Sequence, residues 1–212
     1  MREIATCLAL SAFVINGNAF DIVQTPGHFG GFDSDGSVFT VADEFRFTKN
    51  ALIGSLTWWG GYANPPPGPD SFSLQLFNDA GGHPGILLAG FQIGSIQKVA
   101  TGNFVNPGAH PEYQYSATLQ TPFLAEANVT YWLSIVNPPR DIWLWEASSS
   151  PLNQGVQRSF NGGAWQPYFD NTAFGLNLIP EPANPLLFAL ATVSLAGLRR
   201  WRGRNRIEQT RS

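Results

Sequence analysis

Apolar and polar residues alternate over most of the chain before residue 179, in short segments of period two separated by glycine and proline. The clearest segment carries Tyr131, Leu133 and Ile135 on alternate positions. This period is typical of β-strands that bury one face. The strands that it predicts cover residues 38–41, 43–47, 51–59, 72–76, 86–93, 96–105, 113–119, 131–135, 142–146, 156–160 and 173–178.

Glycine and proline mark the ends of these strands. The Gly-rich stretch 20–35 predicts an irregular leading segment. Gly60 and Gly61 predict the end of one strand, and the proline-rich loop 64–70 lacks the backbone donors that a central strand needs. Before its C-terminal segment the chain has no helical period of useful length and no repeat of fixed length. These features predict an all-β ectodomain over residues 20–178, an antiparallel β-sandwich of jelly-roll type.

The C-terminal segment has a different pattern. The rigid tripeptide Pro180-Glu181-Pro182 precedes an uncharged apolar run over residues 183–198, and arginines follow. As a transmembrane helix this run would be about 24 Å long, enough to cross a thin or locally compressed bilayer. Because arginines are costly to translocate, we expect them to stay in the cytoplasm while the domain lies outside. The basic cluster consists of Arg199, Arg200, Arg202, Arg204 and Arg206.

The order of tripeptide, apolar helix and arginine cluster resembles the PEP-CTERM sorting signal of Gram-negative bacteria. The resemblance assigns residues 179–206 to the sorting signal, with a tail at 207–212, and implies that the chain is a substrate of exosortase, a membrane protease. It also implies a transient stay in the inner membrane, cleavage near Pro180-Glu181-Pro182, and delivery of the ectodomain to the cell surface or extracellular matrix. A plain C-terminal membrane anchor and an amphipathic helix packed on the domain are the alternatives, although an all-apolar run has no polar face.

The ectodomain itself resembles the β-sandwich modules that often precede PEP-CTERM tails. The resemblance lies in residues 41–45, 56–62, 82–85 and 129–135. It implies a fold and a location more than an activity, because these modules are mostly uncharacterised.

The N-terminal residues 1–19 have the pattern of a secretory signal peptide. Arg2 stands at the front, an apolar stretch follows, and the small residues Gly17 and Ala19 precede the expected cleavage point. Glu3 offsets the charge of Arg2, so a first β-strand of the domain is the alternative. The only cysteine of the chain lies in this segment, so the exported domain would depend on its core rather than on disulfides.

The predicted domain is acidic. Residues 20–182 contain 5 Lys and Arg against 13 Asp and Glu, which gives a formal net charge of −8, whereas the whole chain carries −3. A surface of this sign repels phosphate backbones, and no basic aromatic patch opposes it. We therefore expect no nucleic-acid partner.

The domain lacks the local patterns of common catalytic sites. His28, His83 and His110 lie in Gly- and Pro-rich stretches without metal-ligand spacing, and no Gly-x-Ser-x-Gly turn is present. We therefore predict solvated loop histidines and a protein that is not an enzyme. The carboxylates considered for glycoside cleavage lie at predicted strand edges, and they are Asp43, Glu44, Glu146 and Asp170.

One short segment has the composition of a metal-binding loop. In Asp33-Ser34-Asp35-Gly36, carboxylates alternate toward a glycine turn, which can wrap Ca²⁺ in oxygen ligands. Glu44 stands at the twelfth position from Asp33, but the intervening residues are predicted strand and no helix follows. The segment therefore predicts either a Ca²⁺ site at Asp33 and Asp35 or an ordinary Asp-Gly turn.

Aromatic residues are the main functional signal in the domain. Flat rings near strand ends can stack on sugars while neighbouring polar side chains bond the hydroxyls, although such rings more often fill a core. Exposure of Trp143 and Trp145 beside carboxylates would favour binding or hydrolysis, and burial of both would favour a structural role. The candidate stacking residues are Trp58, Trp59, Tyr62, Trp143, Trp145, Trp165 and Tyr168.

Together these features predict an exported, non-enzymatic surface or matrix protein that interacts with extracellular polysaccharide. One alternative is a secreted polysaccharide hydrolase, which would need a cleft with two carboxylates, at least one of them with a shifted pKa. Another is a purely structural surface protein that has no small ligand.

Overall fold

The structure is a computed structural model. It describes residues 20–180 without residues 37, 65–68, 94–95, 107–108, 139–141, 151–154, 160–161 and 169. The predicted signal peptide and the predicted apolar helix at 183–198 lie outside the described residues. Within the described part of the chain, no helix has the length and apolar character needed to cross a membrane.

The described residues form β-strands joined by turns. These strands make two antiparallel sheets that share one core, so the prediction of an all-β sandwich is confirmed. The strands are β1 (Phe20–Gln24), β2 (Pro26–Asp33), β3 (Phe39–Arg46), β4 (Ala51–Tyr62), β5 (Ser73–Asp79), β6 (Pro84–Gln92), β7 (Gln97–Phe104), β8 (Pro111–Ala125), β9 (Thr130–Val136), β10 (Trp143–Ser148), β11 (Val156–Ser159), β12 (Gln166–Pro167) and β13 (Phe174–Leu178).

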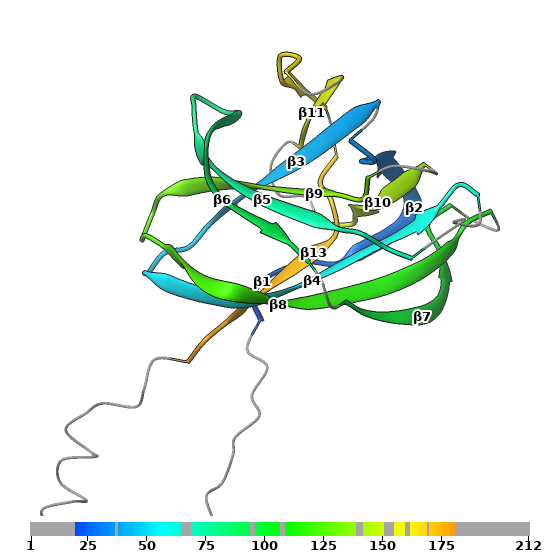
Figure 1. Ribbon diagram of the computed structural model, residues 1–212, viewed down its shortest axis with the longest axis horizontal. Helices are drawn as coiled ribbons and strands as arrows, with labels where there is room; N and C mark the ends of the chain where they lie inside the picture. The colour runs from blue at the N-terminus through cyan, green and yellow to red at the C-terminus, as the bar shows by residue number, and fades with distance from the viewer. Residues whose placement is uncertain are drawn as a thin grey trace, which may run out of the picture.

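Strand β4 lies at the centre of the seven-stranded sheet. Along one edge it pairs with β8, and along the other edge it pairs first with β13 and then with β10. Beyond these neighbours, β1 pairs with β13, β2 with β10 and β7 with β8. Because Phe20 at the start of β1 pairs with Asn177 near the end of β13, the two ends of the domain lie side by side (Figure 1).

The six-stranded sheet has the order β12-β11-β3-β9-β5-β6. In Figure 1 it lies above the seven-stranded sheet, on the side away from the ends of β1 and β13. Its outer face is therefore the face of the sandwich farthest from the points where the chain enters and leaves the domain.

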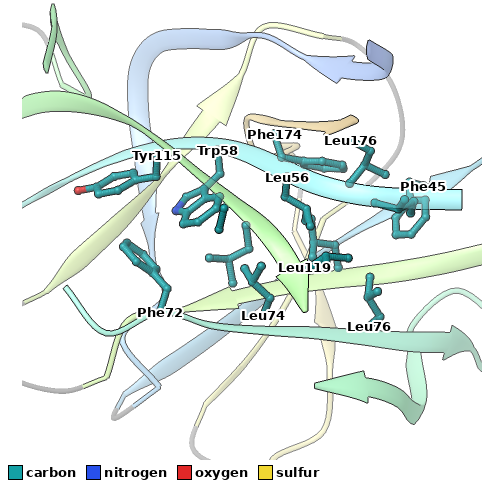
Figure 2. Packing of buried hydrophobic residues seen from close by; sticks show 14 of the residues in the cluster. Phe45, Leu56, Trp58, Phe72, Leu74, Leu76, Tyr115, Leu119, Phe174 and Leu176 are labelled. Atoms are coloured by element: carbon teal, nitrogen blue, oxygen red, sulfur yellow. The ribbon is translucent and has the colours of Figure 1, made fainter. Parts of the chain in front are cut away.

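Alternate side chains of both sheets fill the space between them. Phe45, Leu74 and Leu76 of the six-stranded sheet lie opposite Leu56 and Trp58 of β4 (Figure 2). All five are at most 2% exposed. Burial of each such side chain stabilises the fold by about 1.5–3 kcal/mol relative to an exposed position, which makes the shared core the main source of stability.

Two predictions about the strands are wrong. The Gly-rich leading segment forms β1 and β2, because β13 and β10 supply backbone partners that its own sequence does not reveal. Strand β4 continues through Gly60 and Gly61. A Cβ at Gly60 would lie 2.4 Å from the carbonyl oxygen of Leu144, and one at Gly61 would lie 2.4 Å from that of Pro111. Both glycines therefore permit close approach of neighbouring strands instead of ending β4.

Candidate functional site

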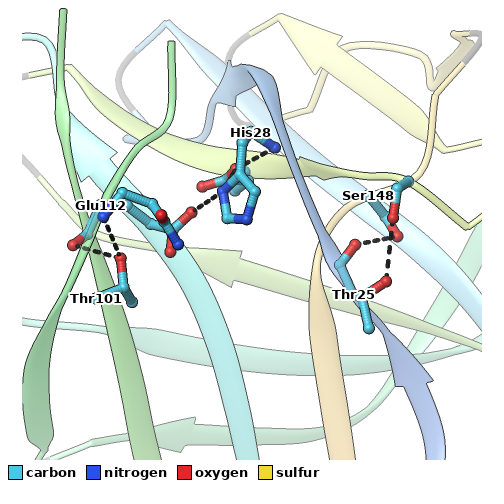
Figure 3. Close-up of polar contacts among 8 residues, drawn as sticks. Thr25, His28, Thr101, Glu112 and Ser148 are labelled. Atoms are coloured by element: carbon cyan, nitrogen blue, oxygen red, sulfur yellow. Dashed lines mark hydrogen bonds and ion pairs between the residues drawn. The ribbon is translucent and has the colours of Figure 1, made fainter. Parts of the chain in front are cut away.

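Three titratable side chains converge on the outer face of the seven-stranded sheet. Nδ1 of His28 on β2 lies 2.7 Å from Oε2 of Glu112 on β8 and 3.4 Å from Oε1 of Glu146 on β10. The backbone N–H of His28 also donates to Oε1 of Glu146, at 2.8 Å. Figure 3 shows the imidazole directed toward Glu112. We call these three residues the His-Glu-Glu cluster.

Strand pairing explains how the two glutamates meet. Trp145 faces the core, so the next residue along β10, Glu146, faces outward. Gly61 of β4 pairs with Glu112 on one side and with Leu144 on the other. Gly61 therefore separates the backbone of Glu112 from that of Leu144, and Glu146 lies two residues farther along β10 on the same face.

A bulge in β2 places His28 over the glutamates. Gly31 pairs with Glu146 and Pro26 pairs with Ser148, so five residue steps along β2 match two along β10. Within this bulge His28 has a φ of +58°, in the left-handed region that most residues avoid but histidine adopts more often than most. The bulge thereby directs both the imidazole and the backbone N–H of His28 at the carboxyl groups.

The glutamates of the cluster are buried, and the histidine is half exposed. Side-chain exposure is 1% for Glu112, 0% for Glu146 and 42% for His28. Burial, and after it the neighbouring Glu112, raise the pKa of Glu146 to about 9. Oε1 of Glu112 and Oε2 of Glu146 are buried and accept no hydrogen bond. Two acidic groups therefore share one buried position, where the raised pKa favours a proton on Glu146 at neutral pH.

The burial of these carboxyl groups limits the chemistry that they can perform. The hydrolase hypothesis requires two carboxylates, one with a shifted pKa, and Glu112 and Glu146 meet that requirement. A general acid must also come within hydrogen-bond distance of its substrate, which side chains exposed by 1% or less cannot do without rearrangement. The geometry therefore suits a proton or a small ion rather than a sugar chain.

The predictions for single members of the cluster are wrong. His28 belongs to β2 and contacts two carboxylates instead of lying in a solvated loop. Glu146 is buried within β10 instead of standing at an ordinary strand edge. The sequence does not identify Glu112, because His28 lies 84 positions from Glu112 and 118 from Glu146, and no local spacing connects them.

Asp43 is another buried carboxylate, and it faces the core rather than the surface. Its side chain is 0% exposed, and its Oδ2 accepts from the backbone N–H of Thr172 at 2.5 Å and from the Thr172 hydroxyl at 3.0 Å. With its amide oriented to donate, Gln24 adds a third hydrogen bond at 3.2 Å. Burial raises the pKa of Asp43 to about 7. The prediction of a strand-edge carboxylate is therefore wrong for Asp43 as well.

A groove crosses the outer face of the six-stranded sheet. It encloses about 180 Å³. Hydroxyl, amide and guanidinium groups line it together with two apolar side chains, which gives hydrogen-bonding capacity along an open surface. Its lining includes Thr40, Gln75, Gln92, Val136, Pro138 and Arg158.

Arg158 connects the groove to an aromatic cluster on the same face. Its Cζ lies 4.5 Å from the ring centroid of Trp165, and this half-buried ring packs in turn against Phe77. Nε of Arg158 is buried and donates no hydrogen bond, and burial lowers the pKa of the guanidinium. The groove thus offers polar donors beside a partly exposed ring, a combination suited to sugar hydroxyls and sugar faces.

The prediction of sugar stacking is wrong for the most buried aromatic residues. Trp58, Trp143 and Trp145 are 0% exposed, and Tyr62 is 8% exposed. The rings of Trp143 and Trp145 stack on each other at a centroid distance of 6.4 Å. No face of these rings is open to a sugar, and the burial of Trp143 and Trp145 favours a structural role for β10.

The remaining aromatic candidates are half-buried. Trp59 lies on the seven-stranded sheet, and Trp165 lies beside the groove. Tyr168 packs against Phe32 with ring centroids 4.2 Å apart, which places it among the rings bordering the core. Trp165 is therefore the candidate that the structure brings next to a groove.

The segment from Asp33 to Gly36 forms a turn. The backbone N–H of Val38 donates to Oδ1 of Asp35 at 3.0 Å, and Gly36 has a φ of +74°. Burial, and after it the nearby Asp35, raise the pKa of Asp33 to about 6. Among the described residues, the cluster close enough to hold a metal ion through three side chains is His28, Glu112 and Glu146. The hydrogen bond and backbone at Asp35 and Gly36 are those of an Asp-Gly turn, and the Ca²⁺ site at Asp33 and Asp35 stays a prediction.

The predicted sorting motif lies almost wholly outside the described residues. Pro180 is exposed at the end of the described chain, while Glu181, Pro182 and the arginine cluster fall beyond it. The sorting signal therefore stays a prediction.

Comparison with known proteins gives a family without an assigned activity. No curated protein matches the chain significantly. The family described as "Domain of unknown function (DUF7901)" matches residues 21–185, a range that includes the two sheets, the groove and the His-Glu-Glu cluster. The chain therefore belongs to the DUF7901 family.

Proposed function

We propose that this chain is an exported β-sandwich protein that binds extracellular polysaccharide through the groove on its six-stranded sheet. The observation that carries the proposal is the polar groove that adjoins a half-buried tryptophan, Trp165, through the guanidinium of Arg158. Sugars combine apolar ring faces with many hydroxyls, so they suit a surface that pairs an aromatic ring with amide and guanidinium donors.

The charge of the domain restricts the kind of polysaccharide. Residues 20–182 carry more than twice as many acidic as basic residues, so an anionic polymer would be repelled at long range. A neutral glycan avoids that repulsion. Gln75 and Gln92 would bond its hydroxyls by donating and accepting, Arg158 would donate only, and Trp165 would cover one sugar face.

Export and sorting are the second part of the proposal. The pattern of residues 1–19 supports a signal peptide, and the order of motifs in residues 179–206 supports a PEP-CTERM signal with a transmembrane helix that exosortase removes. In the jelly-roll arrangement that we propose, the chain enters and leaves the domain at neighbouring points of the seven-stranded sheet, where β1 pairs with β13. An ectodomain held by its C-terminus would then turn its six-stranded sheet away from the membrane (Figure 1), and the groove lies on the outer face of that sheet.

Binding is tested by affinity electrophoresis of the full chain in gels containing exopolysaccharide from its native host. Retardation should be seen for the wild type and should fall by about tenfold in apparent affinity for Trp165→Ala, because stacking on one ring contributes about 1–2 kcal/mol. Arg158→Gln should also lower the apparent affinity for the polysaccharide. Trp59→Ala is the matched control, since Trp59 is a half-buried tryptophan on the other sheet. Retardation that is equal in all four proteins would exclude the groove.

Sorting is tested by mass spectrometry of the mature protein from the host envelope and medium. A start near Phe20 and an end near Pro180 would establish export and cleavage. An intact C-terminus retained in the inner membrane would refute sorting and leave a plainly anchored ectodomain.

A purely structural surface protein is the second candidate. The burial of Trp143 and Trp145 favours it, because both tryptophans of β10 are used for packing. This candidate predicts correct sorting with no retardation by any polysaccharide, so the two experiments together separate it from the binding protein.

A further inference from the structure

The His-Glu-Glu cluster has an arrangement that its strands do not require for packing. Each of its members comes from a different strand, and each carboxyl group keeps one buried oxygen that accepts no hydrogen bond. A buried carboxylate that lacks hydrogen bonds destabilises the fold unless a positively charged group compensates its charge. The imidazole of His28 is 42% exposed, so the cluster borders solvent on this side.

We infer that His28, Glu112 and Glu146 form a binding site for a first-row divalent metal ion, of the kind that Zn²⁺ occupies. Nδ1 of His28 and one oxygen from each glutamate all lie within 4.8 Å of one another, so small side-chain movements would place them around one ion. One nitrogen and two carboxylate oxygens are ligands that zinc accepts, with water in its fourth position. Ca²⁺ fits less well because it takes six to eight oxygen ligands.

The surroundings of Glu146 match those of a metal ligand. The backbone N–H of His28 donates to Oε1 of Glu146 at 2.8 Å, and such an outer hydrogen bond fixes the orientation of a ligating carboxylate. A divalent ion would also balance the two buried carboxylates. Since the ligands come from β2, β8 and β10, the ion would fasten the bulge of the edge strand β2 to the sheet.

The test is a titration of the metal-free full chain, purified in mild detergent, with Zn²⁺ alone. Isothermal calorimetry should show one ion per chain. The midpoint of thermal unfolding should rise by about 5 °C or more once free Zn²⁺ reaches about 100 times the dissociation constant. Glu112→Gln and Glu146→Gln keep the side-chain shape, and each should weaken binding by at least about tenfold, because even residues behind a ligand contribute that much.

Two further variants separate this site from others. His28→Asn removes the imidazole but keeps a residue that tolerates the left-handed backbone, so it should fold and lose Zn²⁺ affinity. Glu126→Gln, at an exposed turn position, should bind as the wild type does. Absence of saturable Zn²⁺ binding by the wild type, or equal affinity in wild type and His28→Asn, would overturn the inference and leave a cluster that holds only a proton.

A measurement on the wild type alone guards against variants that fail to fold. Zn²⁺ should slow hydrogen exchange of the backbone amides of β2, because the ion would hold the bulge closed. Slower exchange confined to segments that contain His83 or His110 would place the ion elsewhere and would also overturn the inference.

Discussion

Replacement of Asp43 by asparagine should change how the stability of the domain depends on pH. Asp43 is 0% exposed and faces the core, where Oδ2 accepts two hydrogen bonds from Thr172 while Oδ1 accepts none. Asparagine keeps a carbonyl oxygen for the donors of Thr172 but has no charge to bury. The substitution therefore separates the cost of ionisation from the hydrogen bonds.

The size of this pH dependence follows from the difference between the pKa of Asp43 in the folded chain and its pKa in the unfolded chain. Burial, only partly opposed by the hydrogen bonds from Thr172, raises the pKa of Asp43 from 3.8 to about 7. As pH rises, the unfolded chain therefore loses this proton before the folded chain does. The contribution is most favourable below about pH 4, declines between about pH 4 and pH 7, and is constant above that range. The difference between the two pKa values corresponds to about 4 kcal/mol of stability lost across the window.

Urea unfolding of wild type, Asp43→Asn and Asp170→Asn at several values between about pH 4 and pH 8 measures this loss directly. Asp170→Asn is the control because Asp170 is exposed. Wild type and control should lose about 4 kcal/mol more than Asp43→Asn, and the other titrating groups should affect all three proteins alike. If the Asp43→Asn curve ran parallel to that of the wild type, the folded-state pKa of Asp43 would not be raised and the reasoning from burial would be refuted.

Two further predictions concern packing. Gly60→Ala should destabilise the domain by about 1–3 kcal/mol, because its Cβ would lie 2.4 Å from the Leu144 carbonyl oxygen. Gly90→Ala is the control and should be tolerated, since its Cβ would have its nearest contact at 3.9 Å. Equal unfolding midpoints for the two variants would contradict the close approach of β4 and β10. Trp145→Ala should lower stability by about 3–5 kcal/mol, since its 0% exposed ring also donates to the Ala173 carbonyl oxygen, and calorimetry should show a much smaller effect for half-buried Trp59→Ala.

The strands that could be predicted are those whose own residues alternate. In β9, Tyr131, Leu133 and Ile135 all enter the core, as their period indicates. The strands β1 and β2 could not be predicted in this way, because β2 is rich in glycine and forms where distant strands supply its hydrogen-bond partners. Gly60 shows the same limit, since glycine in a sequence marks either a strand end or a close approach, and only the neighbouring strand decides which.

The candidate sites were harder to predict than the fold. Aromatic content draws attention to Trp165, but it cannot separate that residue from Trp143, since burial depends on which face of which sheet a strand presents. The His-Glu-Glu cluster depends on a bulge in β2 and on two strand pairings across β4, so no spacing within the sequence reveals it. Its only local signal is His28 in a Gly-rich stretch, where a left-handed backbone is easily accommodated.

The buried carboxyl groups of this domain differ in a way that separates structure from function. Asp43 is enclosed by donors of the fold itself, from Thr172 and Gln24, and no further ligand-type side chains among the described residues gather around it. Glu112 and Glu146 instead meet beside the imidazole of His28, whose side chain is 42% exposed and borders solvent. A fold that needed only rigidity at this position could place apolar side chains there at no electrostatic cost. Two acids beneath one histidine fit the ion binding that we infer, whereas packing alone does not require them.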